Sequence, residues 1–87
     1  MNYLLAKIKN IPFTLIEEIL ENDKSFYEQQ GVFIENIWQN VDDKNEVYFL
    51  AKIESIKNTK EFVEKMRSAT LLVNPDASVA EMTYLIN

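Results

Sequence analysis

The chain has 87 residues, with nine Lys and Arg against fourteen Asp and Glu, a net charge of −5, and neither Cys nor His. This length fits one domain, residues 1–87, whose small core buries roughly 60–65% of the unfolded surface. The missing residue types exclude a disulfide framework, zinc fingers, haem held by His or Cys, and Ser-His or Cys-His catalysis. With a pI near 4.6 the chain is a poor reader of phosphate backbones, so we expect no nucleic-acid partner.

The sequence shows no signal-peptide pattern at its N-terminus. The N-terminal residues lack the basic region and apolar run of a signal peptide, and no apolar stretch approaches 18 residues. We therefore predict a cytoplasmic protein with no membrane partner.

The first strand is predicted at residues 3–11, where apolar and polar side chains alternate from Leu4 onward. After Pro12, Thr14 and Glu17 have the S/T-x-x-E form of a capping box, which predicts a helix from about Leu15.

A second, shorter helical stretch is expected after the weak Asn-Asp pair at 22–23. It runs through Phe26 and Tyr27 and ends at Gly31, the only glycine in the chain. Glycine is the residue that most readily adopts the left-handed conformation that follows a helix end.

A β-hairpin is predicted next. Residues 32–41 are rich in β-branched and aromatic side chains, 42–45 form a polar turn of four residues, and 46–53 form the third strand.

The remainder predicts one helix and one strand. Ser55 or Asn58 caps the helix, residues 74–76 stop it, and residues 78–86 form the last strand; whether 70–73 finish the helix stays open. The order is βαββαβ. This predicts an α+β, ferredoxin-like fold with a four-stranded antiparallel sheet and two helices on one face.

The predicted strands are apolar on both faces, although two helices can cover only one. An exposed apolar sheet of this size is unusual in a monomer, so we predict a homodimer through the sheet face. The third strand places Tyr48 and Leu50 opposite its core residues, and the second strand is expected to set Phe33, Ile37 and Val41 opposite Val32, Ile34 and Trp38.

Several features together resemble the dimeric α+β barrel superfamily. They are the strand order, the length, the stretch QQGVFIENIWQNVDDKNEVYFLAKIES and the final EMTYLI strand. The superfamily includes antibiotic-biosynthesis-type monooxygenases, stress-responsive barrel proteins and small uncharacterised proteins. The resemblance implies two protomers packed sheet on sheet, each with a pocket between sheet and helices. Haem-degrading members use a His ligand that this chain lacks.

Asn36 and Trp38 are the first candidates for a site, because their i, i+2 spacing in a strand places both on one face. There an amide and an indole N–H could orient a polar ligand, as the resemblance to cofactor-independent oxygenases implies; the alternative is a core Trp38 with Asn36 paired locally. Tyr48, like Tyr3 and Tyr84, could point its hydroxyl into a pocket or lie at an interface.

The charged residues give weaker candidates. Glu35 is a possible base if buried, and Asp42 and Asp43 lie in a turn without the spacing of a calcium loop, so no metal or cofactor is expected. The other clustered carboxylates fit solvated helix faces. Arg67, the only arginine, is expected to interact with the C-terminal dipole of its helix.

Three functions therefore compete. The first is a homodimeric module without chemistry of its own that binds a small apolar ligand or another protein. The second is a cofactor-independent enzyme, monooxygenase-like or isomerase-like, with Asn36, Trp38 and a tyrosine such as Tyr48 in a pocket. The third, an acidic decoy of a nucleic-acid-binding protein, is poorly supported because the charge is small and evenly spread.

Overall fold

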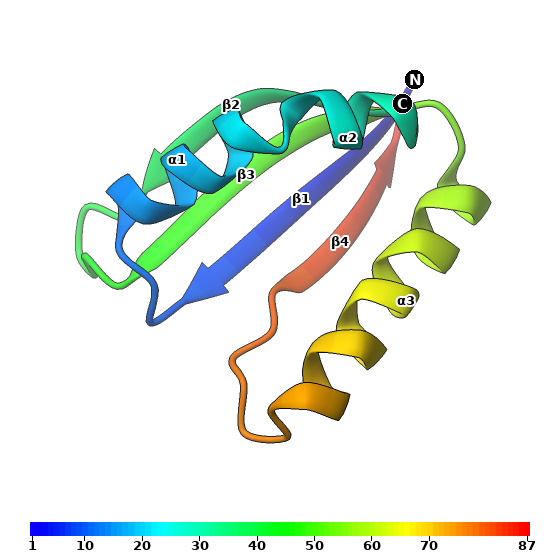
Figure 1. Cartoon of the computed structure of the whole chain (residues 1–87). Coiled ribbons are helices and arrows are strands. Elements are labelled where there is room, and N and C mark those ends of the chain that lie inside the picture. The colour runs from blue at the N-terminus through cyan, green and yellow to red at the C-terminus, as the bar shows by residue number, and fades with distance from the viewer.

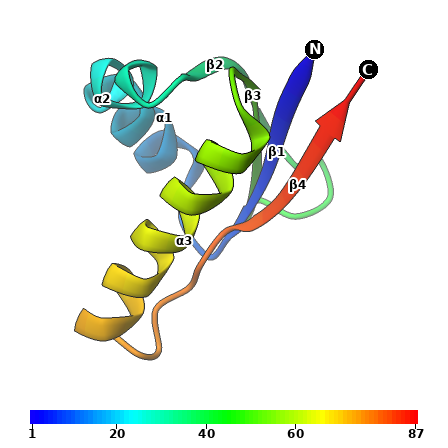
Figure 2. The same ribbon diagram turned by 90° about the vertical axis from the view of Figure 1, so that its right-hand side faces the viewer.

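One antiparallel sheet, with strand order β2-β3-β1-β4, forms the centre of the computed structural model, which describes all 87 residues. Its helices lie on one face of the sheet and leave the other face open (Figures 1 and 2). This confirms the ferredoxin-like arrangement, with the first helix divided into two pieces. The elements are β1 (Asn2–Lys9), α1 (Phe13–Asn22), α2 (Lys24–Gln29), β2 (Val32–Gln39), β3 (Glu46–Ile53), α3 (Ile56–Val73) and β4 (Glu81–Ile86).

The core lies on the central strands β1 and β3, where apolar residues alternate as the sequence predicts. Leu4 pairs with Ala51 and Ala6 with Phe49, and all four side chains are buried beneath the helices. Because the side chains of a strand alternate between its faces, this register sends Tyr3, Leu5 and Lys7 to the open face. No helix is both long and apolar enough to cross a membrane.

Helix α1 begins earlier than predicted, and the predicted capping box is wrong. The N-cap residue is Pro12, in extended conformation and without a side-chain cap. The backbone N–H groups of Leu15 and Ile16 both donate to its carbonyl oxygen at 3.1 Å. The chain has therefore entered the helix before Thr14, whose side chain cannot serve as an N-cap from inside the first turn.

The turn into β2 confirms the expected role of Gly31, whose φ is +75°. Its N–H donates to the Glu28 carbonyl and its carbonyl accepts from the Glu54 N–H, both at 3.0 Å. A Cβ at this position would lie 3.3 Å from the Glu54 side chain. Both the backbone conformation and the space therefore favour glycine.

The hairpin connection between β2 and β3 spans residues 40–45 and is longer than the predicted four-residue turn. The side chain of Asn40 accepts from the Asp42 N–H, and that of Asp43 from the Asn45 N–H, each at 2.9 Å. These local bonds replace ladder bonds and end β2 at Gln39. Val41, predicted to lie within the strand, is consequently 96% exposed.

Helix α3 begins as one of the two predicted caps requires, with the Ser55 hydroxyl accepting from the Asn58 N–H at 3.1 Å. Residues 70–73 complete this helix, which resolves the ambiguity in that stretch. The last strand starts at Glu81 instead of residue 78. Residues 74–80 form an irregular segment that returns the chain to the sheet (Figure 1).

Candidate functional site

A cavity of about 180 Å³ lies between the sheet and the helices. All 14 residues that line it are hydrophobic, and they come from every strand and every helix of the fold. They include Leu4, Ile16, Tyr27, Phe49, Val63 and Met82. We call this space the core cavity.

The core cavity exists because the helices on this face diverge. In Figures 1 and 2, α1 and α2 form one group and α3 a separate arm on the same side of the sheet. An aromatic cluster joins the two groups: the ring centroid of Phe62 on α3 lies 5.7 Å from that of Phe26 and 6.4 Å from that of Tyr27. Side chains reach across at this cluster, while the space enclosed by sheet and helices is left unfilled.

Tyr27 brings the only hydroxyl group to the lining of the core cavity. Burial raises the pKa of this hydroxyl, and the nearby negative charge of Asp23 raises it further. The phenol is therefore neutral at physiological pH and can donate a hydrogen bond. The sequence places Tyr27 in a short helical stretch, but nothing in the local pattern shows which way that stretch faces.

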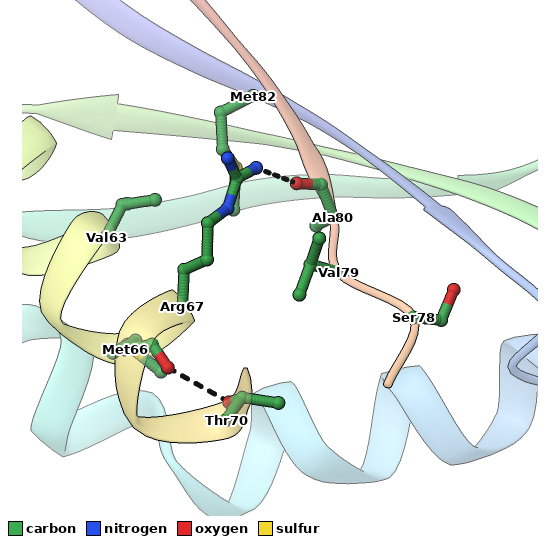
Figure 3. A pocket seen from close by; sticks show the side chains of 8 residues that line it. All are labelled: Val63, Met66, Arg67, Thr70, Ser78, Val79, Ala80 and Met82. Atoms are coloured by element: carbon green, nitrogen blue, oxygen red, sulfur yellow. Dashed lines mark hydrogen bonds between the residues drawn. The ribbon is translucent and has the colours of Figure 1, made fainter. Parts of the chain in front are cut away.

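A second cavity, of about 170 Å³, adjoins the first (Figure 3). The two share Val63, Met66, Ala80 and Met82, and the second adds Arg67, Thr70, Ser78 and Val79. We call this second space the Arg67 cavity. It lies between the C-terminal half of α3 and the irregular segment that precedes β4.

Arg67 does not interact with the end of its helix, so the sequence prediction for this residue is wrong. The last turn of α3 contains no basic residue, and the Nη2 group of Arg67 donates to the Ala80 carbonyl at 3.0 Å (Figure 3). The side chain crosses from the helix to the segment before β4. This carbonyl can accept the bond because Ala80 precedes the strand and is outside the β1–β4 pairing.

Asn36, Trp38 and Tyr48 lie together on the open face of the sheet and do not line the core cavity. Trp38 pairs with Tyr48 across the strands, and Asn36 pairs with Leu50. The indole of Trp38 is 47% exposed, so Trp38 is not a core residue.

A β-bulge at Glu35 decides these positions and corrects the predicted faces of β2. The register shifts between Ile34, which pairs with Ala51, and Asn36, which pairs with the adjacent Leu50. The extra residue reverses the alternation from that point on. Ile37 therefore shares the helix side with Val32 and Ile34, while Phe33 shares the open face with Asn36 and Trp38.

One edge of the open face carries a polar cluster around Glu46. The Glu46 carboxylate accepts hydrogen bonds from the Tyr48 hydroxyl and from the Asn40 amide, the latter at 3.2 Å, and Lys7 Nζ lies 3.8 Å away. The bond from Tyr48 is the main cause that lowers the pKa of Glu46, and the same bond raises the pKa of Tyr48.

The other tyrosines proposed from the sequence are separated by the sheet. Tyr3 pairs with Lys52 on the open face, whereas Tyr84 lies on the helix side with Lys60 Nζ 5.1 Å from its ring centroid. Glu35 is exposed at the bulge, and no group of three or more acidic side chains is arranged to hold a metal ion.

Comparison with solved structures places this fold among known ones. A Deinococcus radiodurans protein, provisionally assigned as an antibiotic biosynthesis monooxygenase, superposes with a TM-score of 0.63 at 6% identity over 100% of this chain and 92% of its own. A structural-genomics protein from Agrobacterium tumefaciens gives a TM-score of 0.57 at 17% identity, over 99% of this chain and 92% of its own. No protein-family model and no curated protein matches the sequence. The chain therefore shares the fold of these two proteins, and this agrees with the ferredoxin-like arrangement predicted from its sequence.

Proposed function

We propose that this protein binds a small, largely apolar ligand in the core cavity. The observation that carries the proposal is a cavity of about 180 Å³ whose lining is entirely hydrophobic. A dry apolar cavity of roughly 150 Å³ is large enough for benzene, so a ligand with one or two rings fits. The lining offers one neutral hydroxyl, that of Tyr27, which suits recognition better than catalysis.

Energetics support a role for this space. Apolar side chains that line a partly open space lack the packing contacts that a filled core would give them. The total stability of a small domain is only about 5–15 kcal/mol. A ligand that fills the cavity replaces the missing dispersion contacts and stabilises the folded state by mass action.

Methionine-methyl NMR tests the proposal with indole as the probe. Two of the three methionines, Met66 and Met82, line the core cavity, whereas Met1 is 63% exposed. We expect saturable shifts of the Met66 and Met82 methyl signals with the Met1 signal unchanged. The Val63→Phe variant should lose these shifts, and Leu72→Phe, which adds the same ring at an exposed position of α3, should keep them. Absence of saturable shifts at millimolar indole would contradict the proposal.

The second part of the proposed function is a homodimer formed through the open face of the sheet, the side not covered by helices. We call it the outer face from here on. This face carries large apolar side chains, among them Leu5, Leu50 and the partly exposed Phe33, Trp38 and Leu85. Four strands of six to eight residues form this face. At about 4.8 Å between strands and about 3.3 Å per residue, the sheet measures roughly 20 by 25 Å before its side chains are counted.

A second copy of the chain is the occupant that this outer face fits. The outer face carries charges of both signs: Lys7 lies within 4.0 Å of Glu46 and Glu81, and Lys52 lies at the other end of β3. Two identical faces of this kind can meet without opposing charges of only one sign. Sedimentation at micromolar concentration should give twice the 10.2 kDa of the chain. A species of 10.2 kDa at 100-micromolar protein would contradict the dimer.

A cofactor-independent monooxygenase is the second candidate, favoured by the provisional assignment of the Deinococcus neighbour. In such a reaction an activated ring CH₂ becomes C=O, one oxygen atom of O₂ enters the carbonyl, the other leaves as water, and the substrate supplies all four electrons. Asn36 and Trp38 lie outside the core cavity, so Tyr27 and Arg67 would be the polar groups at hand. Oxygen uptake with an anthrone as substrate, abolished by Val63→Phe, would support the enzyme; uptake equal to the protein-free rate would contradict it.

A further inference from the structure

Arg67 is a charged side chain held against apolar surroundings without a counter-ion. It is the only charged residue lining either of the two adjoining cavities. Its Nη2 group donates to the Ala80 carbonyl at 3.0 Å, but its Nε is buried and has no hydrogen-bond partner. The two salt bridges of the molecule both involve Lys7, so no carboxylate lies within 4.0 Å of the guanidinium.

A guanidinium group that has no counter-ion and lies beside a cavity is a candidate binding group for an anion. Arginine stays protonated at every accessible pH and has five donors but no acceptor. A buried donor without a partner is unfavourable, and buried charges in proteins are usually paired. The bond to Ala80 satisfies one donor and fixes the direction of the side chain. Because Nε is covered by neighbouring atoms, an incoming anion would meet the terminal nitrogens, of which Nη1 makes no hydrogen bond.

Arg67 lies close enough to the core cavity to contact a ligand that reaches beyond it. The Arg67 cavity shares four lining residues with the core cavity, so the two spaces are neighbours and a ligand that spans both would pass these residues. One end of such a ligand meets only hydrophobic side chains, and the other meets the guanidinium (Figure 3). A planar guanidinium matches a carboxylate better than any other common small anion except phosphate. Phosphate is strongly hydrated, and the two hydroxyl groups of the Arg67 cavity, those of Thr70 and Ser78, already donate to backbone carbonyls, so phosphate would find no further side-chain donor there.

We propose that the ligand is an aryl- or alkyl-substituted carboxylic acid, with its apolar body in the core cavity and its carboxylate accepting a hydrogen bond from a terminal nitrogen of the Arg67 guanidinium. This inference rests on the proposed binding function and adds the chemical class of the ligand. It assigns Arg67 the role of specificity-determining residue. The bond to the Ala80 carbonyl positions the guanidinium before the ligand arrives.

A matched pair of probes, 3-phenylpropionate and 3-phenylpropanamide, tests the charge at constant shape. Affinities are measured from the Met66 and Met82 methyl signals of the intact protein. In the unmodified protein we expect the acid to bind at least about tenfold more tightly than the amide, as a charge-assisted hydrogen bond implies.

Two variants assign this preference to Arg67. Arg67→Met keeps an apolar stem of similar reach, and it should reduce the affinity for the acid to that for the amide without changing the amide. Arg67→Lys restores a charge without the planar fork, so it should recover only part of the preference. If Arg67→Met does not fold, the acid and amide affinities of the unmodified protein and of Arg67→Lys still decide the question.

The outcomes separate this inference from the proposed function. Equal binding of acid and amide in the unmodified protein, or an acid preference that persists in Arg67→Met, would overturn the role of Arg67 and leave the core cavity as a ligand site. If neither probe nor indole shifts the methionine signals, both the inference and the binding function are wrong.

Discussion

The two faces of the sheet both carry large apolar side chains, but the helix side is incompletely filled and the outer face is uncovered. The helix side is covered by α1, α2 and α3 but is incompletely filled, so a partly open cavity of about 180 Å³ remains there. The outer face is closely set with side chains from all four strands but has no cover. A small molecule can fill an empty cavity, whereas an exposed apolar face can be covered only by a second protein surface. The comparison thus predicts a ligand site on one face of the sheet and an interface on the other.

The largest effect should come from truncating an aromatic residue on the covered side. Phe49→Ala should lower the free energy of unfolding by about 3–4 kcal/mol, because Phe49 is only 8% exposed and packs in the core. Phe33→Ala, on the outer face and 37% exposed, should cost no more than about 1.5 kcal/mol. Urea unfolding of both variants in the Leu50→Lys background, which removes association, checks the contrast. Equal losses would contradict the assignment of the two faces.

The next effect concerns association. Leu50 pairs with both Leu5 and Asn36 at the centre of the outer face, and Leu50→Lys would place a charge there. We expect the dissociation constant of the dimer to rise at least about 100-fold while the fold is retained. Val41→Lys, at a fully exposed loop position, is the matched control and should leave sedimentation unchanged. A Leu50→Lys protein that remains dimeric would show that the interface lies elsewhere.

Filling the core cavity should raise the free energy of unfolding, by less than Phe49→Ala lowers it. Val63 lines both cavities, and Val63→Phe should raise the free energy of unfolding by about 1 kcal/mol by occupying empty space. Leu72→Phe, on the same helix but exposed, should be neutral within about 0.5 kcal/mol. Thermal unfolding measures both. A clear destabilisation by Val63→Phe would mean that the helices already close on the cavity in solution.

Replacing a buried hydroxyl group on α3 should also raise the free energy of unfolding, by a similar or smaller amount. Thr59 is 1% exposed, and its Oγ1 is buried without a hydrogen-bond partner. Thr59→Val replaces this hydroxyl by a methyl group of the same shape and should raise stability by about 1 kcal/mol. Ser55→Ala, which removes the cap of the same helix, should lower it by about 1 kcal/mol. Denaturant midpoints measured side by side would reveal a wrong sign in either variant.

The smallest effect is a pH dependence at the edge of the outer face. The pKa of Glu46 is lowered in the folded state, mainly by the hydrogen bond from Tyr48. A lowered folded-state pKa gives stability that is fully present above the usual glutamate pKa and is lost as pH falls through the lowered one. Tyr48→Phe should therefore lose less stability on acidification than the unmodified protein. Identical acid-unfolding profiles would show that this bond is not maintained in solution.

Local sequence signals were reliable where a backbone property required one residue type or where a pattern was long. Gly31 adopts φ +75° at the end of α2, and β3 spans Glu46–Ile53 as its alternation predicted. The Thr14–Glu17 motif failed because Pro12 already starts the helix, so an intact motif was not used. A motif shows what the chain could form, and the preceding turn decides whether it forms.

The candidate site was the least predictable part. Asn36 and Trp38 do share a face, because their spacing alone requires it, but the face is the outer one. Which side of β2 meets the helices depends on the bulge at Glu35, and no residue in that stretch is a glycine or proline that would mark a bulge.

The sequence by itself determined the order of the elements, the ferredoxin-like fold class and the excess of apolar side chains over what two helices can cover, because these follow from short-range periodicity and composition. Only the tertiary structure decided where that excess lies, since the divergence of α3 from α1 and α2 creates the core cavity and brings Arg67 beside it. Cavities and orphaned donors depend on packing between elements distant in the chain, and such packing leaves no local pattern in the sequence.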